Sequence, residues 1–208
     1  MLELGNPVEY NFGTKLSLEP RQDSDNVQFT ERGMRLHADS PFNAGPPVKY
    51  IGMYCVAAPD EGGESLIAMC DAFFQQAPDD LLDTMHEILV EYRNRIADYY
   101  KDHPGRAEHP RVKPIQIDPD TGRRRLVIGF TDPDDPTRTH DAAVVVGYSA
   151  DESAELLRRI EAELHKPAVL YTHKWRAGEV MVLDNRRVLH GRAAFPNQTR
   201  KIVRLSVA

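Results

Sequence analysis

Two stretches that lie far apart in the chain, Leu36-His37-Ala38-Asp39 and Val188-Leu189-His190-Gly191-Arg192, decide how this sequence is expected to fold. Side chains alternate between the two faces of an extended strand, so His37 and Asp39 should point the same way. A second imidazole, that of His190, would complete three ligands on one face of a metal ion if its strand lay alongside. The fold is therefore expected to bring the two ends of the chain together.

Several β-branched or aromatic segments, separated by Pro and Gly turns, are typical of strands. We expect strands over residues 33–39, 48–56, 64–69, 168–172, 179–183 and 202–207. Many short strands with few helices favour a β-sandwich or barrel over an alternating βαβ fold. The sequence thus predicts a mainly β fold with helical insertions.

Two segments have the apolar spacing of a helix. Apolar residues recur at intervals of three and four from Leu81 onward, which predicts a helix over residues 79–103. A second helix is expected over residues 150–166. It should begin at a capping box, in which the Ser149 hydroxyl pairs with Glu152.

The segment 105–140 is rich in Pro and Asp and is expected to be an insertion. Residues 112–117 and 125–130 flank the sequence Asp118-Pro119-Asp120-Thr121-Gly122, which is typical of a hairpin turn. The loop over residues 132–136 is a candidate lid above the site.

Length and composition indicate one globular domain, residues 1–208, with a short N-terminal region over residues 1–30. The net charge of −6 comes without a basic face, so we expect no nucleic-acid partner. No apolar run is long enough for a bilayer, and no signal peptide is recognised, so we expect no membrane association. Cys55 and Cys70 lack CxxC spacing and are expected to be buried thiols in a cytoplasmic protein.

The triplet His37-x-Asp39 is common by chance, and several further motifs give it weight. These are Leu36-His37-Ala38-Asp39-Ser40-Pro41-Phe42, Pro59-Asp60-Glu61-Gly62-Gly63-Glu64-Ser65-Leu66, His109-Pro110, Asp118-Pro119-Asp120-Thr121-Gly122-Arg123-Arg124, Trp175-Arg176-Ala177-Gly178-Glu179, and Asp184-Asn185-Arg186-Arg187-Val188-Leu189-His190-Gly191-Arg192 followed by Arg200 and Arg204. In this order they resemble the TauD/TfdA-like Fe(II)- and 2-oxoglutarate-dependent oxygenases of the clavaminate-synthase-like group. The resemblance covers roughly residues 26–208.

The resemblance implies a double-stranded β-helix core, a jelly roll like that of the cupins. It also implies that His37, Asp39 and His190 are the iron ligands, which agrees with the facial ligand set of non-heme Fe(II) oxygenases. Related halogenases have a small residue at the carboxylate position. Asp39 therefore argues against halogenation.

The same resemblance assigns Arg204 to the distal carboxylate of 2-oxoglutarate, because a guanidinium can bind a carboxylate through two parallel hydrogen bonds. Ser65 would add a hydroxyl donor, where relatives commonly have Thr. Arg200 is expected to contact the cosubstrate or the substrate, and a surface position on a strand is the alternative.

The implied activity is an oxidation that uses Fe(II), 2-oxoglutarate and O2 and releases succinate and CO2. Its simplest form hydroxylates an unactivated C–H bond of a small polar or amino-acid-like metabolite. Gln28, Phe42, Tyr54 and Arg192 are candidate pocket walls, with ordinary packing as the alternative for each. Relatives usually carry more residues before the first ligand. The pocket is therefore expected to be more open, or completed by a partner subunit in a homo-oligomer.

Three other readings stay open. The first is desaturation or cyclisation, which begins with the same hydrogen abstraction. The second is a β-roll protein that binds a metal or a small acid without turnover. The third is a hydrolase or isomerase that uses another divalent metal, and the pair of Ser65 and Arg204 counts against it because such an enzyme would not need that pair.

Overall fold

In the computed structural model of the chain, residues 4–9, 13–22, 24, 26–39, 48–93, 109–130, 142–196 and 198–208 are described. Eight of their strands form two four-stranded antiparallel sheets. The first sheet has the order β1 (Lys15–Leu18), β13 (Lys201–Val207), β3 (Tyr50–Ala57) and β11 (Val180–Asp184). The second has the order β10 (Leu170–His173), β4 (Ser65–Met69), β12 (Val188–Arg192) and β2 (Met34–His37).

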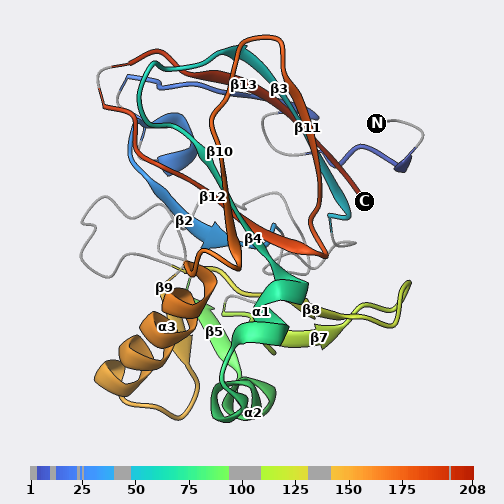
Figure 1. The fold of residues 1–208 in the computed structure, drawn as a ribbon, viewed down its shortest axis with the longest axis vertical. Helices are drawn as coiled ribbons and strands as arrows, with labels where there is room; N and C mark the ends of the chain where they lie inside the picture. Colours follow the sequence, from blue (N-terminus) through green and yellow to red (C-terminus); the bar gives the residue numbers. More distant parts are fainter. Residues whose placement is uncertain are drawn as a thin grey trace.

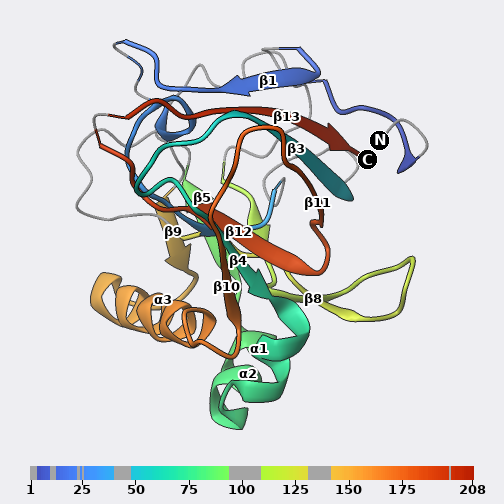
Figure 2. The ribbon, with the colours of Figure 1, turned by 45° about the horizontal axis from the view of Figure 1, so that its top comes forward.

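The two sheets share an apolar core. Side chains alternate along β3, so Ile51, Met53 and Cys55 turn inward, where they meet Ile67 of β4 and Val188 of β12. Figure 2 shows β1, β13 and β3 in one layer, with β12, β4 and β10 beside it. Strands from both ends of the chain therefore meet in one sandwich, as the positions of the predicted metal ligands require.

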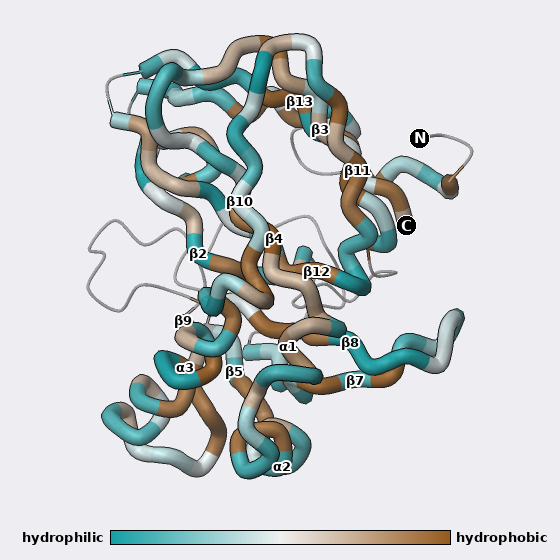
Figure 3. The backbone as a smooth tube through the Cα atoms, viewed as in Figure 1, coloured by the Kyte–Doolittle hydropathy of each residue, from teal (hydrophilic) through white to brown (hydrophobic). Residues whose placement is uncertain are grey.

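The three α-helices of the described segments lie together at one end of the molecule (Figure 1). They are α1 (Cys70–Gln76), α2 (Asp79–Glu87) and α3 (Ala150–Leu164). Beside them lie a three-stranded sheet of β6 (Arg111–Val112), β5 (Val90–Arg93) and β9 (Ala142–Val145), and a hairpin of β7 (Ile115–Ile117) and β8 (Arg124–Leu126). The tube of Figure 3 alternates between hydrophilic and hydrophobic along α2 and α3, as expected for helices with one buried face.

Several predicted elements are confirmed with shorter bounds. The capping box at Ser149 and Glu152 is present at the start of α3. The hairpin of β7 and β8 flanks the predicted turn, where Asp118 accepts hydrogen bonds from the backbone N–H and the hydroxyl of Thr121. Both cysteines are buried and unpaired.

The predicted helix over residues 79–103 is wrong beyond Glu87. Ile88 adopts an extended conformation and ends α2, and β5 follows as a strand paired with β6 and β9. Val90 and Tyr92 are fully buried, two residues apart, which is the period of a strand. Tertiary pairing therefore overrides the helical spacing, and residues 94–103 lie outside the described segments.

Some elements were not predicted. A helix, α1, follows β4 directly, and the polar N-terminal region contains β1 and a 3-10 helix, η2 (Val27–Phe29). The candidate lid over residues 132–136 lies outside the described segments, so the lid and the single-domain organisation stay predictions. In the segments that are described, no helix has the length and apolar character needed to cross a membrane.

Candidate metal centre

The antiparallel pairing of β2 with β12 places His37 opposite His190. Their ring centroids lie 4.4 Å apart, and the ring planes are tilted by 49°. The register shifts between His190 and Arg192, and the backbone of β2 comes very close at Gly191. A Cβ added there would lie 2.6 Å from the carbonyl oxygen of Met34. Glycine at this position therefore allows the approach that brings the two imidazoles together.

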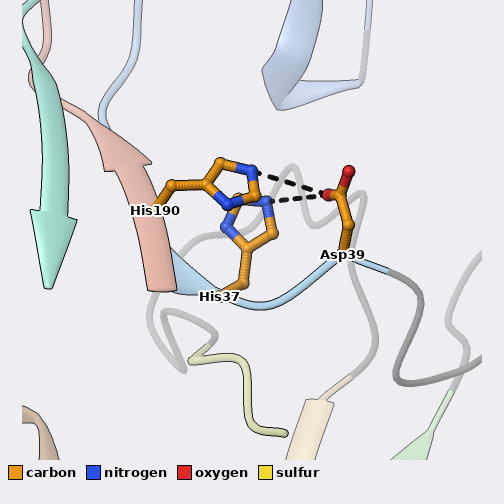
Figure 4. A group of neighbouring side chains, drawn as sticks. All are labelled: His37, Asp39 and His190. Atoms are coloured by element: carbon orange, nitrogen blue, oxygen red, sulfur yellow. Dashed lines mark ion pairs between the residues drawn. The ribbon is translucent and has the colours of Figure 1, made fainter. Parts of the chain in front are cut away.

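Asp39 follows the end of β2, and its carboxylate turns toward both imidazoles (Figure 4). Its Oδ1 lies 3.7 Å from Nε2 of His37 and 3.6 Å from Nε2 of His190. The ligand atoms of these three residues lie within 4.8 Å of one another. Donors bound to one metal ion at right angles are about 3 Å apart, so small side-chain rotations would complete the set. The expectation that the three residues meet is confirmed.

The surroundings of the two imidazoles favour metal binding through Nε2. Nδ1 of His37 donates to the carbonyl oxygen of Arg35 at 2.9 Å, which leaves the Nε2 lone pair directed at the centre. Burial lowers the pKa of His190 to about 4, so this ring is neutral at neutral pH, as a metal ligand must be. The Nδ1 atom of His190 is buried and finds no hydrogen-bond partner among the described residues.

Asn185, quoted in the sequence motif without a role, holds the backbone of the carboxylate ligand in place. Its Oδ1 accepts from the Asp39 N–H at 2.9 Å, and its Nδ2 donates to the Asp39 carbonyl oxygen at 3.2 Å. Nδ2 also donates to the carbonyl oxygen of Val48 at 2.9 Å, and the side chain is buried. A buried Asn just before the strand of His190 was a signal that the sequence offered, but its partner could not be read from it.

Replacing Asn185 with Ala should therefore weaken metal binding. We expect the affinity for Fe(II) or Mn(II) to fall by about 10- to 100-fold, as for other residues that orient a ligand, and the folded state to lose about 2 kcal/mol because buried backbone groups lose partners. Metal titration and thermal unfolding measure the two effects. Gln198→Ala is a matched control, because this amide brackets the backbone of Glu61 in the same two-way manner at the surface. Unchanged metal affinity in Asn185→Ala would contradict the assigned role.

Arg204 lies directly beside the centre. Its guanidinium is paired with Oδ2 of Asp39 and donates to the hydroxyl of Ser206 at 3.0 Å. The two oxygens of Asp39 therefore face different partners, Oδ1 toward the imidazoles and Oδ2 toward Arg204. This arrangement keeps the carboxylate oriented and leaves one oxygen for a metal ion.

Two further arginines are buried close to each other. The guanidiniums of Arg192 and Arg200 lie over the ring of Phe195, at 5.0 and 5.7 Å from its centroid. Burial lowers the pKa of Arg192 to about 9 and that of Arg200 to about 10, so both are charged at neutral pH. Among the described residues, neither is paired with a carboxylate, since Arg200 donates to the carbonyl oxygen of Gly63 and Arg192 donates to backbone carbonyls. Two unneutralised buried cations favour an anion as ligand.

Ser65 begins β4 next to these cations. It is the register partner of Arg192 across β4 and β12, and its side chain is buried. Its hydroxyl oxygen accepts a hydrogen bond from Nε1 of Trp175 at 2.9 Å. The structure thus brings Ser65 and Arg200 to one region, whereas Arg204 lies against Asp39.

The structure places the candidate pocket-wall residues in different surroundings. Tyr54 is 46% exposed, because Met53 and Cys55 on either side take the inward positions of β3, so its assignment to the pocket is wrong. Gln28 lies in η2 between the buried residues Val27 and Phe29, and its contact with a substrate stays a prediction. Phe42 lies outside the described segments.

Arg192, the fourth predicted wall residue, binds backbone carbonyl groups. Its guanidinium donates to the carbonyl oxygens of Val27, Gln28, Thr30 and Arg32 and so fixes η2 and the turn after it against β12. Its contact with a substrate stays a prediction.

The sequence of the chain matches a known protein family. The model of the taurine catabolism dioxygenase TauD, TfdA family matches residues 9–206. The chain is 25% identical over 210 residues to 3-((Z)-2-isocyanoethenyl)-1H-indole synthase of Fischerella ambigua, covering 98% of the chain and 73% of that protein. It is 24% identical over 214 residues to tyrosine isonitrile desaturase of Pseudomonas aeruginosa, covering 97% of the chain and 68% of that protein.

Among solved structures, PvcB from Pseudomonas aeruginosa aligns with a TM-score of 0.75 at 21% identity, covering 99% of the chain and 68% of PvcB. A second structure of PvcB, described as an Fe, alpha-ketoglutarate dependent oxygenase from an isonitrile synthetic pathway, aligns with a TM-score of 0.72. At this identity the likeness concerns the fold, and it confirms the mainly β architecture with a jelly-roll core.

Proposed function

Because the chain belongs to the taurine catabolism dioxygenase TauD, TfdA family, we propose that it is an Fe(II)- and 2-oxoglutarate-dependent oxygenase acting on a small molecule. The observation that carries this proposal is the meeting of His37, Asp39 and His190 within 4.8 Å. Two imidazoles and one carboxylate on one side of a metal ion, with the other side open, form the ligand set of non-heme Fe(II) oxygenases.

The proposed iron ligands are Nε2 of His37, Oδ1 of Asp39 and Nε2 of His190. When bound there, Fe(II) supplies the redox chemistry that activates O2. The contact of Arg204 with Oδ2 supports binding of Asp39 through a single oxygen. An Asp39 that binds through one oxygen would leave more of the metal open to cosubstrate and O2.

2-Oxoglutarate carries a carboxylate at each end, and the chain offers cations for both. Ser65 and Arg200 suit the distal carboxylate, because both are buried and Arg200 is not paired with any described carboxylate. Arg204 lies against Asp39, so it suits the end nearer the metal. This division differs from the prediction made from the sequence, which gave the distal carboxylate to Arg204 and left the role of Arg200 open.

In the proposed reaction, 2-oxoglutarate, O2 and a substrate C–H give succinate, CO2 and a C–OH, with one oxygen atom in succinate and one in the product. The residues of the chain hold and orient the reactants and exclude water from them. The test is an aerobic incubation with Fe(II), 2-oxoglutarate and a panel of amino-acid-like compounds. Succinate released in step with a hydroxylated product supports the proposal. Metal-loaded, folded protein that releases no succinate with any compound counts against it.

Desaturation is the second candidate, because one relative is named a desaturase and PvcB belongs to an isonitrile pathway. In that outcome the substrate loses two hydrogen atoms, and the second oxygen atom leaves as water. Mass spectrometry of the product separates the outcomes, since hydroxylation adds an oxygen atom and desaturation removes two hydrogens. An amino-acid-derived isonitrile is therefore a sensible member of the panel.

We also propose a cellular location for the enzyme. The free, buried thiols of Cys55 and Cys70 support a reducing, cytoplasmic location. The absence of a nucleic-acid partner and the formation of a homo-oligomer stay predictions.

A further inference from the structure

Trp175, the only tryptophan in the sequence, contacts Ser65 of the proposed cosubstrate site. Its side chain is 4% exposed, and its indole Nε1–H donates to the Ser65 hydroxyl at 2.9 Å. An indole N–H is a donor only, so the Ser65 oxygen must act as the acceptor in this bond. The hydrogen of the Ser65 hydroxyl is therefore turned away from Trp175.

No described residue accepts that hydrogen. The charged side chains nearby are donors: Arg192 is the register partner of Ser65, and Arg200 already occupies the carbonyl oxygen of Gly63, two residues earlier in the chain. A buried hydroxyl donor without an acceptor is costly, and two buried cations add to the need for negative charge. A group that only accepts hydrogen bonds, such as a carboxylate, meets all of these requirements at once.

We propose that Trp175 is a positioning residue that fixes Ser65 as a donor and thereby makes the site select a carboxylate over a neutral amide. An amide NH2 would bring further donors next to the Ser65 hydroxyl and the guanidinium of Arg200, which are donors already. The inference rests on the proposed function, because it concerns the end of the site assigned to the distal carboxylate of 2-oxoglutarate.

The orientation of the indole is itself restrained. His173 packs edge-on against it, with ring centroids 4.7 Å apart and an interplanar angle of 88°, and lies opposite Ser65 in the pairing of β10 with β4. Nε2 of His173 is 3.2 Å from a carboxylate oxygen of Glu179. The indole also belongs to the apolar core between the sheets. The N–H therefore has little freedom to turn away from Ser65.

The test compares binding of 2-oxoglutarate with binding of its C5 amide, 2-oxoglutaramate, to the Fe(II)-loaded protein under nitrogen, by calorimetry. We expect the native protein to prefer the carboxylate by about 10- to 100-fold, the range for a hydrogen bond to a charged group. In Trp175→Phe the ratio of the two affinities should fall by about 5- to 10-fold, because Ser65 can rotate to accept from the amide. In a Ser65→Ala background, Trp175→Phe should leave the ratio unchanged.

Replacement of the single tryptophan by benzothienylalanine, which keeps the ring shape but lacks the N–H, gives the same test without loss of packing. An unchanged ratio in either replacement overturns the role of Trp175. So does an equal fall in the affinities for both compounds, which would indicate a purely structural role. If the native protein binds neither compound although it holds Fe(II), the proposed function itself fails.

Discussion

His190→Ala is expected to abolish tight metal binding and catalysis together. The imidazole is one of three proposed ligand groups, and it is neutral and buried, so no solvent-exposed side chain can easily take its place. Loss of an orienting residue costs about 10- to 100-fold in metal affinity, so we expect loss of the ligand itself to cost about 1,000-fold or more. Turnover of 2-oxoglutarate should fall at least as far.

Metal titration and succinate release measure the two effects. His86→Ala is the control, because this histidine is exposed on α2. Circular dichroism should show that both variants fold. Retention of native metal affinity by His190→Ala would rule out His190 as a ligand and with it the proposed centre.

Arg200→Ala should weaken 2-oxoglutarate binding by about 100-fold while leaving metal affinity unchanged. The reason is that the distal carboxylate would lose a buried charged partner, which typically costs about 2 to 5 kcal/mol. The free protein should tolerate the change, because no described carboxylate loses its counter-charge. Calorimetric titration of the Fe(II)-loaded protein with 2-oxoglutarate gives the affinity. Added 2-oxoglutarate should raise the melting temperature of the native protein but not that of the variant.

Arg204→Ala provides the comparison that separates the two assignments of the distal carboxylate. Because Arg204 is paired with Asp39, its loss should weaken metal binding by about 10- to 100-fold. Arg158→Ala is the surface control, since Arg158 is exposed on α3 and paired with Glu155. The opposite outcome is a loss of 2-oxoglutarate affinity with normal metal binding in Arg204→Ala, together with unchanged 2-oxoglutarate affinity in Arg200→Ala. That outcome would show that Arg204 holds the distal carboxylate.

The ligand set could be predicted because its signals are local. Residues two apart on a strand point to the same face, so His37 and Asp39 could be placed together without knowledge of the fold. The register that puts His190 opposite His37 could not be predicted, since pairing between distant strands leaves little trace in one sequence. The close approach at Gly191 became clear only when β2 was in place.

The roles of the arginines and of Asn185 could not be predicted from sequence spacing. Arg192, Arg200 and Arg204 are all buried, and each reaches a partner in another part of the chain: η2, the turn before β4, and Asp39. Long side chains can reach in several directions, so the position of the Cα says little about the contact.

The fold errors have similar physical causes. Apolar residues in the segment after α2 fit a helical period, but Val90 and Tyr92 are buried in a strand that exists only because β6 and β9 flank it. Tyr54 was a candidate pocket wall, whereas the alternation of β3 turns it outward. In both cases the tertiary environment decides between patterns that the sequence leaves equivalent.

An anaerobic optical titration with Fe(II) and 2-oxoglutarate reports directly on whether His37, Asp39 and His190 hold an iron ion that binds the cosubstrate. We expect a visible charge-transfer band that needs both components, is lost in His190→Ala and requires much more 2-oxoglutarate in Arg200→Ala. Folded native protein that shows no such band, with both components in excess, would contradict the assignment of His37, Asp39 and His190 as an iron centre that binds 2-oxoglutarate.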